Sequence, residues 1–514
     1  MASTAVSTPS ITPLNGKIHG ETRVPLIIEN VAILGSSEKE YCTSKENYTF
    51  LAATVDIAQK AAESSAQAFE KWSRTSPLQR RRLLLRLAQL LQEKSNEAKR
   101  LMQEEIHCDA LWAHKSYSGS VALIEENASL ATSQTLQGSI PHTHCEDAIA
   151  AVVKRPFGVV LGIAPWNSPL ILAFRAVIAP LVAGNTVILK GSELSPKSHY
   201  FVANLFVEAG FPPGVVNFLL HRPQDAASVV QNLINHTAVR KINFTGSTNV
   251  GRIIAKAAAE VLKPVLLELG GKNCVLVLED ADIQRAAEGV LDGIIENVSS
   301  LPLNLFVHHH TQPATHHANT TEAGQVCMST DTILVVRAVA DKFSQAIRTL
   351  VAQLCQDTYQ LVGPGSSNRV SSFVKDAVEK GANPISSYTD RIEADSERTP
   401  VTVLEGITES MSIFSSESFG PIAGIRVVAD ETEAISIINA LNHGLSSAIW
   451  TQNTHRALRI ASRLHVSALH VNDSTVHDES TLPHGGTNLS GYGRFGSEWG
   501  IQEFLQTQTI VLHP

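Results

Sequence analysis

Apolar segments that resemble strands alternate with helical segments from residue 158 onward, and this alternation constrains the fold more than any other feature of the chain. The first strand is expected at 159–165 ("VVLGIAP"), and Ser168-Pro169 then begins a helix that runs to about Val182. Further strands are expected at 186–190, 215–219, 239–244 and 264–269. Apolar strands separated by helices of roughly a dozen residues predict an α/β fold with a parallel sheet covered on both faces.

The segment before this alternation, residues 52–128, has a mostly helical pattern. Ser76-Pro77 is a typical helix start, because serine caps the first turn and proline suits its first position. The leucines that follow lie at helical spacing and predict one buried face: Leu83, Leu84, Leu87, Leu90 and Leu91.

Length and composition indicate a protein of two or three domains, because 514 residues are too many for one core. The net charge of −8 argues against a nucleic-acid surface, and no stretch reaches the roughly 18 apolar residues of a membrane span. The N-terminal residues 1–17 have no signal-peptide pattern. Six cysteines without paired spacing suit a reducing compartment, so we expect a cytoplasmic protein.

Ligands of parallel sheets bind beyond the carboxyl ends of the strands, so the residues found there are the candidates for a site. Gly246, Ser247 and Gly251 lie between a strand and a helix, where they favour either a phosphate site or a tight structural turn. Lys190 and Glu193 follow another strand and suit the hydroxyls of an adenosine ribose, with a solvated surface pair as the alternative.

Two further residues are candidates for catalysis. Glu268 ends an apolar strand, where burial is expected to raise its pKa and make it a general base; the alternative is a salt bridge to Lys272 or a helix cap. Cys327 lies in a polar turn that would suit a thiolate nucleophile; the alternative is an inert small apolar side chain, as is expected of Cys274 inside the segment "CVLVL".

The order and spacing of six motifs resemble the NAD(P)-dependent aldehyde dehydrogenase superfamily, from about residue 25 to the C-terminus. The motifs are Pro165-Trp166-Asn167, Lys190 with Glu193, Phe244-Thr245-Gly246-Ser247-Thr248, Glu268-Leu269-Gly270-Gly271-Lys272, Gly324-Gln325-Val326-Cys327 and Glu417-Ser418-Phe419-Gly420-Pro421. The stretches "PWNSPLILAFRAVIAPLVAGNTVILK" and "VNDSTVHDESTLPHGG" look most like its salicylaldehyde and vanillin dehydrogenase branch.

This resemblance implies a mechanism. Cys327 would attack the aldehyde, Asn167 and the Cys327 N–H would hold the oxyanion, and Glu268 would activate the water that hydrolyses the thioester. It implies NAD, more than NADP, as cofactor, because the Glu193 carboxylate would repel a 2′-phosphate. The implied cofactor contacts are Trp166, Lys190, Glu193, Gly246, Ser247, Gly251, Leu269, Glu417 and Phe419.

The resemblance also implies three parts. Residues 1–138 and 159–269 would form a Rossmann-like NAD-binding domain, and 270–482 an α/β catalytic domain. Residues 139–158 and 483–514 would form a small bridging sheet that pairs subunits into a homodimer or homotetramer.

An aromatic or otherwise bulky apolar aldehyde is the expected substrate, and Arg175 would lie near its entrance or serve as an ion-pair residue on a helix. The alternatives are an aliphatic or semialdehyde dehydrogenase, and an inactive member of the family.

The inactive alternative arises from residues 298–322, an insert just before Cys327 that the family pattern lacks. Joining the flanks would give "IIENAGQVC". Because Val298-Ser299 is what an intron donor sequence would encode, we interpret the insert as a translated intron. It carries five histidines, but no nearby carboxylate or cysteine completes a ligand set, so no metal is expected.

Overall fold

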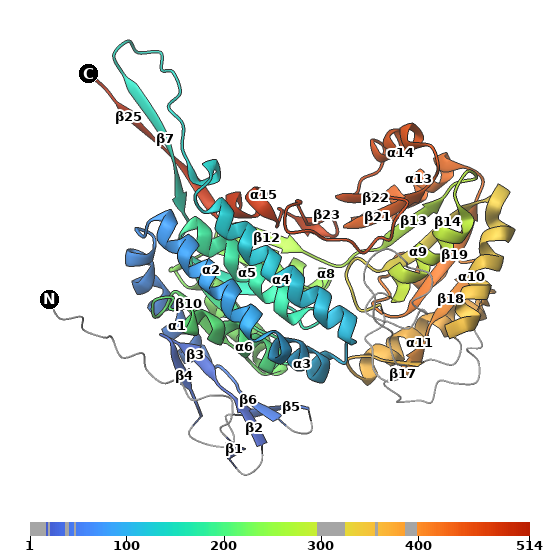
Figure 1. Ribbon diagram of the computed structural model, residues 1–514, viewed down its shortest axis with the longest axis horizontal. Coiled ribbons are helices and arrows are strands. Elements are labelled where there is room, and N and C mark those ends of the chain that lie inside the picture. Colours follow the sequence, from blue (N-terminus) through green and yellow to red (C-terminus); the bar gives the residue numbers. More distant parts are fainter. Residues whose placement is uncertain are drawn as a thin grey trace.

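The computed structural model describes residues 17–18, 21–35, 41–45, 48–295, 324–354, 358–385 and 398–514. The predicted insert at 298–322, with its five histidines, lies outside the described residues. The described chain forms two α/β lobes and a protruding two-stranded arm (Figure 1).

The segment before the alternating region is mostly helical, as predicted. Its described α-helices are α1 (Val55–Trp72), α2 (Pro77–Glu93), α3 (Ser95–Ile106) and α4 (Ala110–Leu130). Ser76 caps α2, since its Oγ accepts from Gln79 N at 3.2 Å while Gln79 Oε1 accepts from Ser76 N at 2.9 Å. This reciprocal capping satisfies two amides that the helix itself cannot. Of the predicted leucine face, Leu84, Leu87, Leu90 and Leu91 are buried and Leu83 is partly buried against the same core.

The first lobe is built on an eight-stranded sheet. Its spatial order is β24 (Gly491–Tyr492), β12 (Val265–Glu268), β11 (Val239–Thr245), β8 (Val159–Ile163), β9 (Thr186–Lys190), β10 (Val216–Leu219), β3 (Leu26–Ile28) and β4 (Val31–Ile33). The five strands from β12 to β10 run parallel, which confirms the predicted parallel sheet. The helices α5 (Pro169–Ala183), α6 (Pro196–Glu208), α7 (Ala226–Asn235) and α8 (Thr248–Glu260) connect them.

The parallel register brings the carboxyl ends of these strands to one edge. Ile163 at the end of β8 pairs with Lys190 on β9 and with Phe244 on β11, and Thr245 pairs with Glu268 on β12. The turns that follow these strands therefore lie side by side, as parallel strands require.

The second lobe has a seven-stranded sheet whose strands are parallel except at β16. Its order is β16 (Asn383–Pro384), β18 (Thr402–Glu405), β19 (Ile422–Val428), β14 (Thr330–Val336), β13 (Asn273–Val277), β21 (Ser446–Trp450) and β22 (Ala468–Val471). All residues of β13 and β14 are buried, because apolar clusters cover both faces of the sheet. The helices of this lobe are α9 (Ile283–Ile295), α10 (Ala340–Leu354), α11 (Pro364–Glu379), α12 (Ser412–Ser415), α13 (Glu431–Ala440) and α14 (Thr454–Ala461).

The arm consists of β7 (Ile149–Pro156) and β25 (Leu505–Leu512), paired antiparallel along their full lengths. It extends from the first lobe and carries the C-terminus near its tip (Figure 1). The predicted pairing of these two segments is confirmed. Their role between subunits, and the domain boundaries, stay predictions.

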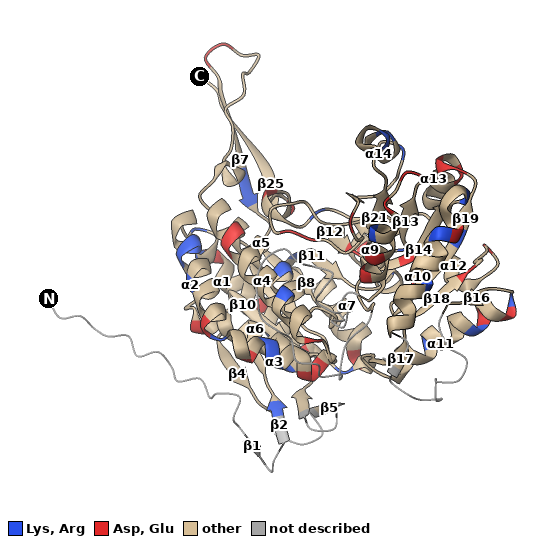
Figure 2. Cartoon of the chain, turned by 45° about the vertical axis from the view of Figure 1, so that its right-hand side comes forward, with Lys and Arg blue, Asp and Glu red and all other residues tan. Residues whose placement is uncertain are grey.

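The remaining elements are short. They are the sheet β1 (Lys17–Ile18), β2 (Glu21–Val24), β6 (Tyr48–Leu51) and β5 (Tyr41–Lys45), the pairs β15 (Thr358–Gln360) with β17 (Arg398–Pro400) and β20 (His443–Gly444) with β23 (Thr487–Asn488), and α15 (Ser497–Gln502). Basic and acidic residues are interspersed over the surface helices (Figure 2). Among the described helices, none is long and apolar enough to span a membrane.

Candidate active site

The candidate site lies where the loop before β14 meets the carboxyl end of β12. Cys327 Sγ donates a hydrogen bond to Glu268 Oε1 at 3.1 Å. Glu268 is only 1% exposed, and its other oxygen, Oε2, accepts from Thr245 Oγ1 at 3.3 Å. The two predicted catalytic residues, far apart in the sequence, are therefore in direct contact.

The loop of Cys327 is held by its backbone. Asn273, the first residue of β13, donates from Nδ2 to Cys327 O at 2.9 Å and to Ser329 O at 2.8 Å. Gly271 is required here, because a Cβ at that position would lie 2.7 Å from Cys327 O. These contacts tie the loop to the turn that follows Glu268.

Asn167 lies beside the same loop. It is 5% exposed, and its Nδ2 donates to Gln325 O at 3.0 Å. One N–H of its amide group is thus used to hold the loop, and the second is available to another acceptor. Gln325 is anchored in turn, since its Oε1 accepts from Val362 N at 3.0 Å.

The electrostatic surroundings of Cys327 differ from the expectation of a thiolate-favouring turn. Burial raises the pKa of the Cys327 thiol well above its ordinary value, and the carboxylates of Glu268 and Glu417 raise it further against the opposing effect of Arg175. The half-buried thiol therefore keeps its proton and donates it to Glu268.

The prediction that burial raises the pKa of Glu268 is wrong in its net direction. Burial does disfavour the charged carboxylate, but the neighbouring imidazole of His484, the Arg175 guanidinium and the Cys327 thiol together outweigh it and lower the pKa of Glu268 to about 2. The predicted alternative of a salt bridge to Lys272 is also wrong, because Lys272 Nζ lies 3.3 Å from Asp331 Oδ1.

Two basic side chains approach the carboxylate of Glu268, and Asp478 contacts both of them. Arg175 on α5 places Nη1 3.5 Å from Glu268 Oε2 and forms an ion pair through Nη2 with Asp478. His484 places Nε2 3.5 Å from Glu268 Oε1 and Nδ1 3.6 Å from Asp478 Oδ1. Sequence reasoning missed Asp478 and His484. Both lie in the stretch "VNDSTVHDESTLPHGG" that carried the resemblance, but nothing in its local pattern points to Glu268.

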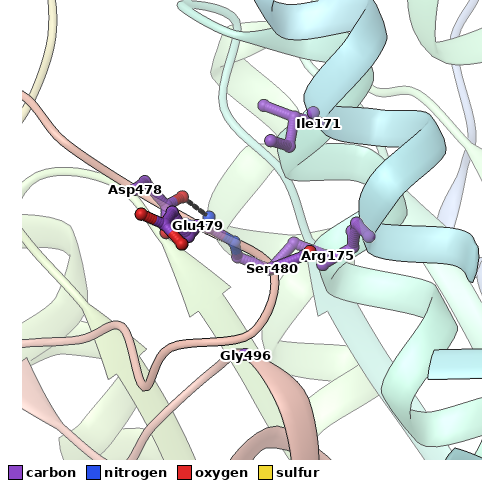
Figure 3. A pocket seen from close by; sticks show the side chains of 8 residues that line it. Ile171, Arg175, Asp478, Glu479, Ser480 and Gly496 are labelled. Atoms are coloured by element: carbon purple, nitrogen blue, oxygen red, sulfur yellow. Dashed lines mark hydrogen bonds and ion pairs between the residues drawn. The ribbon is translucent and has the colours of Figure 1, made fainter. Parts of the chain in front are cut away.

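Arg175 also lines a small pocket with a cavity volume of about 30 Å³. Figure 3 shows its side chain reaching from α5 toward Asp478, with Ile171, Glu479, Ser480 and Gly496 around it. The predicted ion pair of Arg175 is present in the structure. Its place near the entrance for the substrate stays a prediction.

Phe419 and Trp166 meet across the two lobes. Their ring centroids are 5.8 Å apart at 85°, an edge-to-face arrangement. Phe419 adopts a left-handed backbone conformation (φ 50°), which is unusual for a bulky residue and is typical of functional sites.

Glu417 lies against the turn after Glu268. Its Oε1 accepts from Gly271 N at 3.2 Å, and a Cβ at Gly270 would overlap its carboxylate. Burial and the charge of Asp331 raise the pKa of Glu417 to about 7. Its carboxylate also influences Cys327, so the structure brings this predicted cofactor contact near the nucleophile.

Lys190 and Glu193 do not form the solvated surface pair that was the alternative prediction. Lys190 ends β9 and is 9% exposed, and its burial lowers the pKa of the ammonium, an effect that Glu193 partly offsets. Within the described part of the chain, no hydrogen bond of the Lys190 ammonium is found.

The turn at Gly246 leads into α8. Ser247 is exposed and caps the helix, since its Oγ accepts from Val250 N at 3.4 Å. Gly251 packs so closely on Leu269 that a Cβ there would overlap its side chain. Gly251 thus allows α8 to pack tightly against the residue that follows β12. The start of α8 is exposed, so the alternative of a phosphate site is still possible. Among the described residues, no hydrogen bond joins this turn to Cys327.

The comparisons with known proteins agree with this arrangement. A sequence profile of the aldehyde dehydrogenase family matches residues 37–299 and 309–510. The unmatched residues 300–308 fall inside the predicted insert.

The chain is 36% identical over 478 residues to a salicylaldehyde dehydrogenase of Pseudomonas sp. (strain C18), which covers 90% of this chain and 91% of that protein. It is 36% identical over 502 residues to a vanillin dehydrogenase of Pseudomonas sp. (strain HR199 / DSM 7063). That alignment covers 95% of this chain and 98% of the vanillin dehydrogenase.

The crystal structure of a salicylaldehyde dehydrogenase from Pseudomonas putida G7 complexed with salicylaldehyde aligns with a TM-score of 0.86 at 35% identity, over 96% of this chain and 98% of that one. The resemblance and the fold class stated from the sequence are both confirmed. The chain belongs to the aldehyde dehydrogenase family of oxidoreductases.

Proposed function

We propose that the chain oxidises an aromatic aldehyde to the carboxylic acid with NAD, using Cys327 as nucleophile. The observation that carries this proposal is the contact of 3.1 Å between Cys327 Sγ and Glu268 Oε1. A thiol beside an ionised, buried carboxylate pairs a nucleophile with a proton acceptor, as covalent catalysis requires.

The oxyanion would be held by two N–H groups. One is the second amide hydrogen of Asn167, whose first is bonded to Gln325 O. The other is the backbone N–H of Cys327, which donates to no protein group among the described residues. Two donors at the loop of the nucleophile suit the charge that develops when the thiol attacks a carbonyl carbon.

The steps at Cys327 follow from these positions. The thiol sulfur bonds to the aldehyde carbon as its proton passes to Glu268, which gives a thiohemiacetal. When bound, the nicotinamide cofactor supplies the hydride acceptor. Loss of a hydride from the thiohemiacetal oxyanion leaves a thioester on Cys327, and Glu268 passes the proton of the thiol on to solvent. Glu268 then takes a proton from the attacking water, and the acid leaves as the thiol is restored.

The residues of the first lobe fit a nicotinamide dinucleotide. Lys190 holds a buried ammonium without a hydrogen bond to the described residues, and Glu193 follows it; together they suit the two hydroxyls of a ribose. Ser247 at the start of α8 suits a pyrophosphate. Proteins of this family use NAD or NADP. The Glu193 carboxylate favours NAD, because it would repel a 2′-phosphate.

The remaining proposed contacts lie closer to Cys327. Gly246, Gly251 and Leu269 would let the cofactor approach the turn between β11 and α8. Glu417, Phe419 and Trp166 would border the nicotinamide riboside, since Glu417 influences Cys327 and the two rings touch each other.

An aromatic substrate is supported by the side chains around the nucleophile. Val326, Met328 and Leu445 form a small apolar cluster against which Cys327, Trp112 and Val476 pack. Such walls favour a bulky apolar aldehyde over a charged semialdehyde. Arg175 would lie at the entrance, as part of the pocket of Figure 3. The salicylaldehyde and vanillin dehydrogenases among the relatives support the same substrate class.

The test is NADH formation by the purified chain as written and by a variant that lacks residues 298–322, each with benzaldehyde and with propionaldehyde. We expect turnover led by the aromatic aldehyde, and none from Cys327→Ser. Activity in the shortened variant alone would support the translated-intron hypothesis and the inactive alternative for the full chain. A profile led by propionaldehyde would contradict the aromatic substrate.

We also propose that β7 and β25 pair between subunits of a homodimer or homotetramer and form a bridging part beside the cofactor and catalytic domains. The end of the arm, Ile510 to Leu512, exposes apolar side chains. Exposed apolar side chains of this kind favour contact with a second subunit. Light scattering of the chain with and without residues 505–514 tests this. We also propose a cytoplasmic location, because six cysteines without paired spacing in the sequence suit a reducing compartment.

A further inference from the structure

His484 is a buried side chain at the candidate site that the proposed reaction does not use. Its side chain is 8% exposed, and its backbone is fixed by two hydrogen bonds with Phe495, His484 N to O at 2.9 Å and Phe495 N to O at 2.7 Å. The ring of Phe495 in turn lies under the Arg175 guanidinium, 5.6 Å from centroid to Cζ. The backbone that carries the imidazole is therefore tied to Phe495, whose ring contacts Arg175.

The two ring nitrogens of His484 face two different carboxylates. Nε2 lies 3.5 Å from Glu268 Oε1, the same oxygen that accepts from Cys327, and Nδ1 lies 3.6 Å from Asp478 Oδ1. Nε2 has no hydrogen-bond partner among the described residues. Only the imidazolium offers an N–H in both directions, whereas a neutral ring turns a lone pair toward one carboxylate.

The cluster around His484 holds one excess negative charge when His484 itself is left out of the count. Glu268 and Asp478 contribute two negative charges, and Arg175 contributes one positive charge. A buried cluster with an excess negative charge is costly, and the imidazolium removes that excess. The other titratable groups that face the cluster are Cys327, which bonds to Glu268, and His470, whose pKa is lowered by burial and by its neighbours His477 and His484. Glu417 faces it only through Cys327.

We propose that His484 is a positioning residue: its protonated ring, oriented by Asp478, fixes Oε1 of Glu268 toward Cys327 and keeps that carboxylate ionised as the proton acceptor. This inference rests on the proposed function for its catalytic meaning. The contact between His484 and Glu268 is open to test without turnover.

The sign of the effect on pH dependence follows from the contact. His484 is among the groups that lower the pKa of Glu268, while burial acts to raise it. Removing the imidazolium therefore raises the pKa of Glu268. Because the carboxylate is the active form, the acid side of the pH–rate profile moves to higher pH. An opposite charge at this distance lowers a carboxyl pKa by about 1 to 3.

The experiment compares His484→Gln and His484→Asn with a matched control, His477→Gln. His477 lies in the same stretch, is 41% exposed and pairs with Glu479 instead of Glu268. We expect the acid limb of kcat to move up by about 1 to 3 pH units in both His484 variants, with an unchanged KM for the aldehyde. The pH–rate profile of the control variant is expected to coincide with that of the unmodified chain. Glu268→Gln is expected to abolish any further effect of His484→Gln.

An infrared titration of the Glu268 carboxyl band, obtained as the difference from Glu268→Gln, supplies a readout independent of catalysis. Its midpoint is expected to move upward in the His484 variants. An unmoved midpoint, or a raised KM with an unchanged acid limb, overturns the inference even if the enzyme is active. A moved midpoint in a chain that oxidises no aldehyde upholds the contact and defeats the proposed function instead.

Discussion

Replacing Arg175 with methionine removes a buried cation from between two carboxylates while keeping most of the apolar length of the side chain. Arg175 is 7% exposed, and its partners Glu268 and Asp478 are 1% and 19% exposed in their side chains. Among the described residues, the variant leaves His484 as the basic side chain that still faces both carboxylates. Removing one partner of a buried ion pair costs roughly 3–5 kcal/mol of stability, because an uncompensated charge stays behind.

The expected cost lies at the lower end of that range, about 3 kcal/mol. Nε of Arg175 has no hydrogen-bond partner among the described residues, so the native guanidinium is itself incompletely compensated. For a cooperative unit of about 150–250 residues, each kcal/mol lowers Tm by roughly 2–4 °C, so the variant is expected to melt about 6–12 °C lower.

The assay is thermal unfolding of the Arg175→Met variant beside Arg86→Met. Arg86 pairs with Glu93 at 3.4 Å with side chains 46% and 50% exposed, and such surface pairs contribute about 0–1 kcal/mol. Adding Asp478→Leu to Arg175→Met is expected to restore part of the loss, since one of the unpaired charges disappears. Equal melting of the two single variants would refute the reasoning that burial makes the Arg175 pair costly to break.

Three further predictions concern the same site. Asn167→Ala is expected to lower kcat by roughly 10²–10³ with little change in Tm, because one oxyanion donor is lost; steady-state kinetics check this, and an unchanged kcat contradicts it. Glu193→Ala is expected to raise kcat/KM for NADP relative to NAD by about tenfold, equivalent to roughly 1.4 kcal/mol of relieved repulsion, and an unchanged ratio argues that Glu193 does not face the ribose. Because the folded-state pKa of Glu268 is depressed to about 2, the stability it contributes is present above its ordinary pKa near 4.5 and is lost as pH falls toward 2. Unfolding free energies between these pH values should therefore fall less steeply in Glu268→Gln, by up to about 1.4 kcal/mol per pH unit, and parallel curves would exclude the depressed pKa.

Local patterns in the sequence determine most of the first lobe. The segment "TVILK" predicts β9 to the residue, and Ser76-Pro77 predicts the start of α2, because strand period and helix capping are decided within a few residues. The same patterns place Asn167, Lys190 and Glu268 at strand ends, and parallel pairing then brings those ends to one edge. Cys327 is assigned to the same site only by the order and spacing of the family motifs in the sequence.

Only the tertiary structure decides the electrostatics of that edge. Burial of Glu268 is visible in its apolar strand, but the direction of its pKa depends on Arg175 and His484, which come from α5 and from a loop near the C-terminus. Lys272 is four residues from Glu268 in the sequence, yet it pairs with Asp331. The interaction of two charges depends on their separation in space and on the water excluded between them. The spacing of residues along the chain determines neither of these quantities.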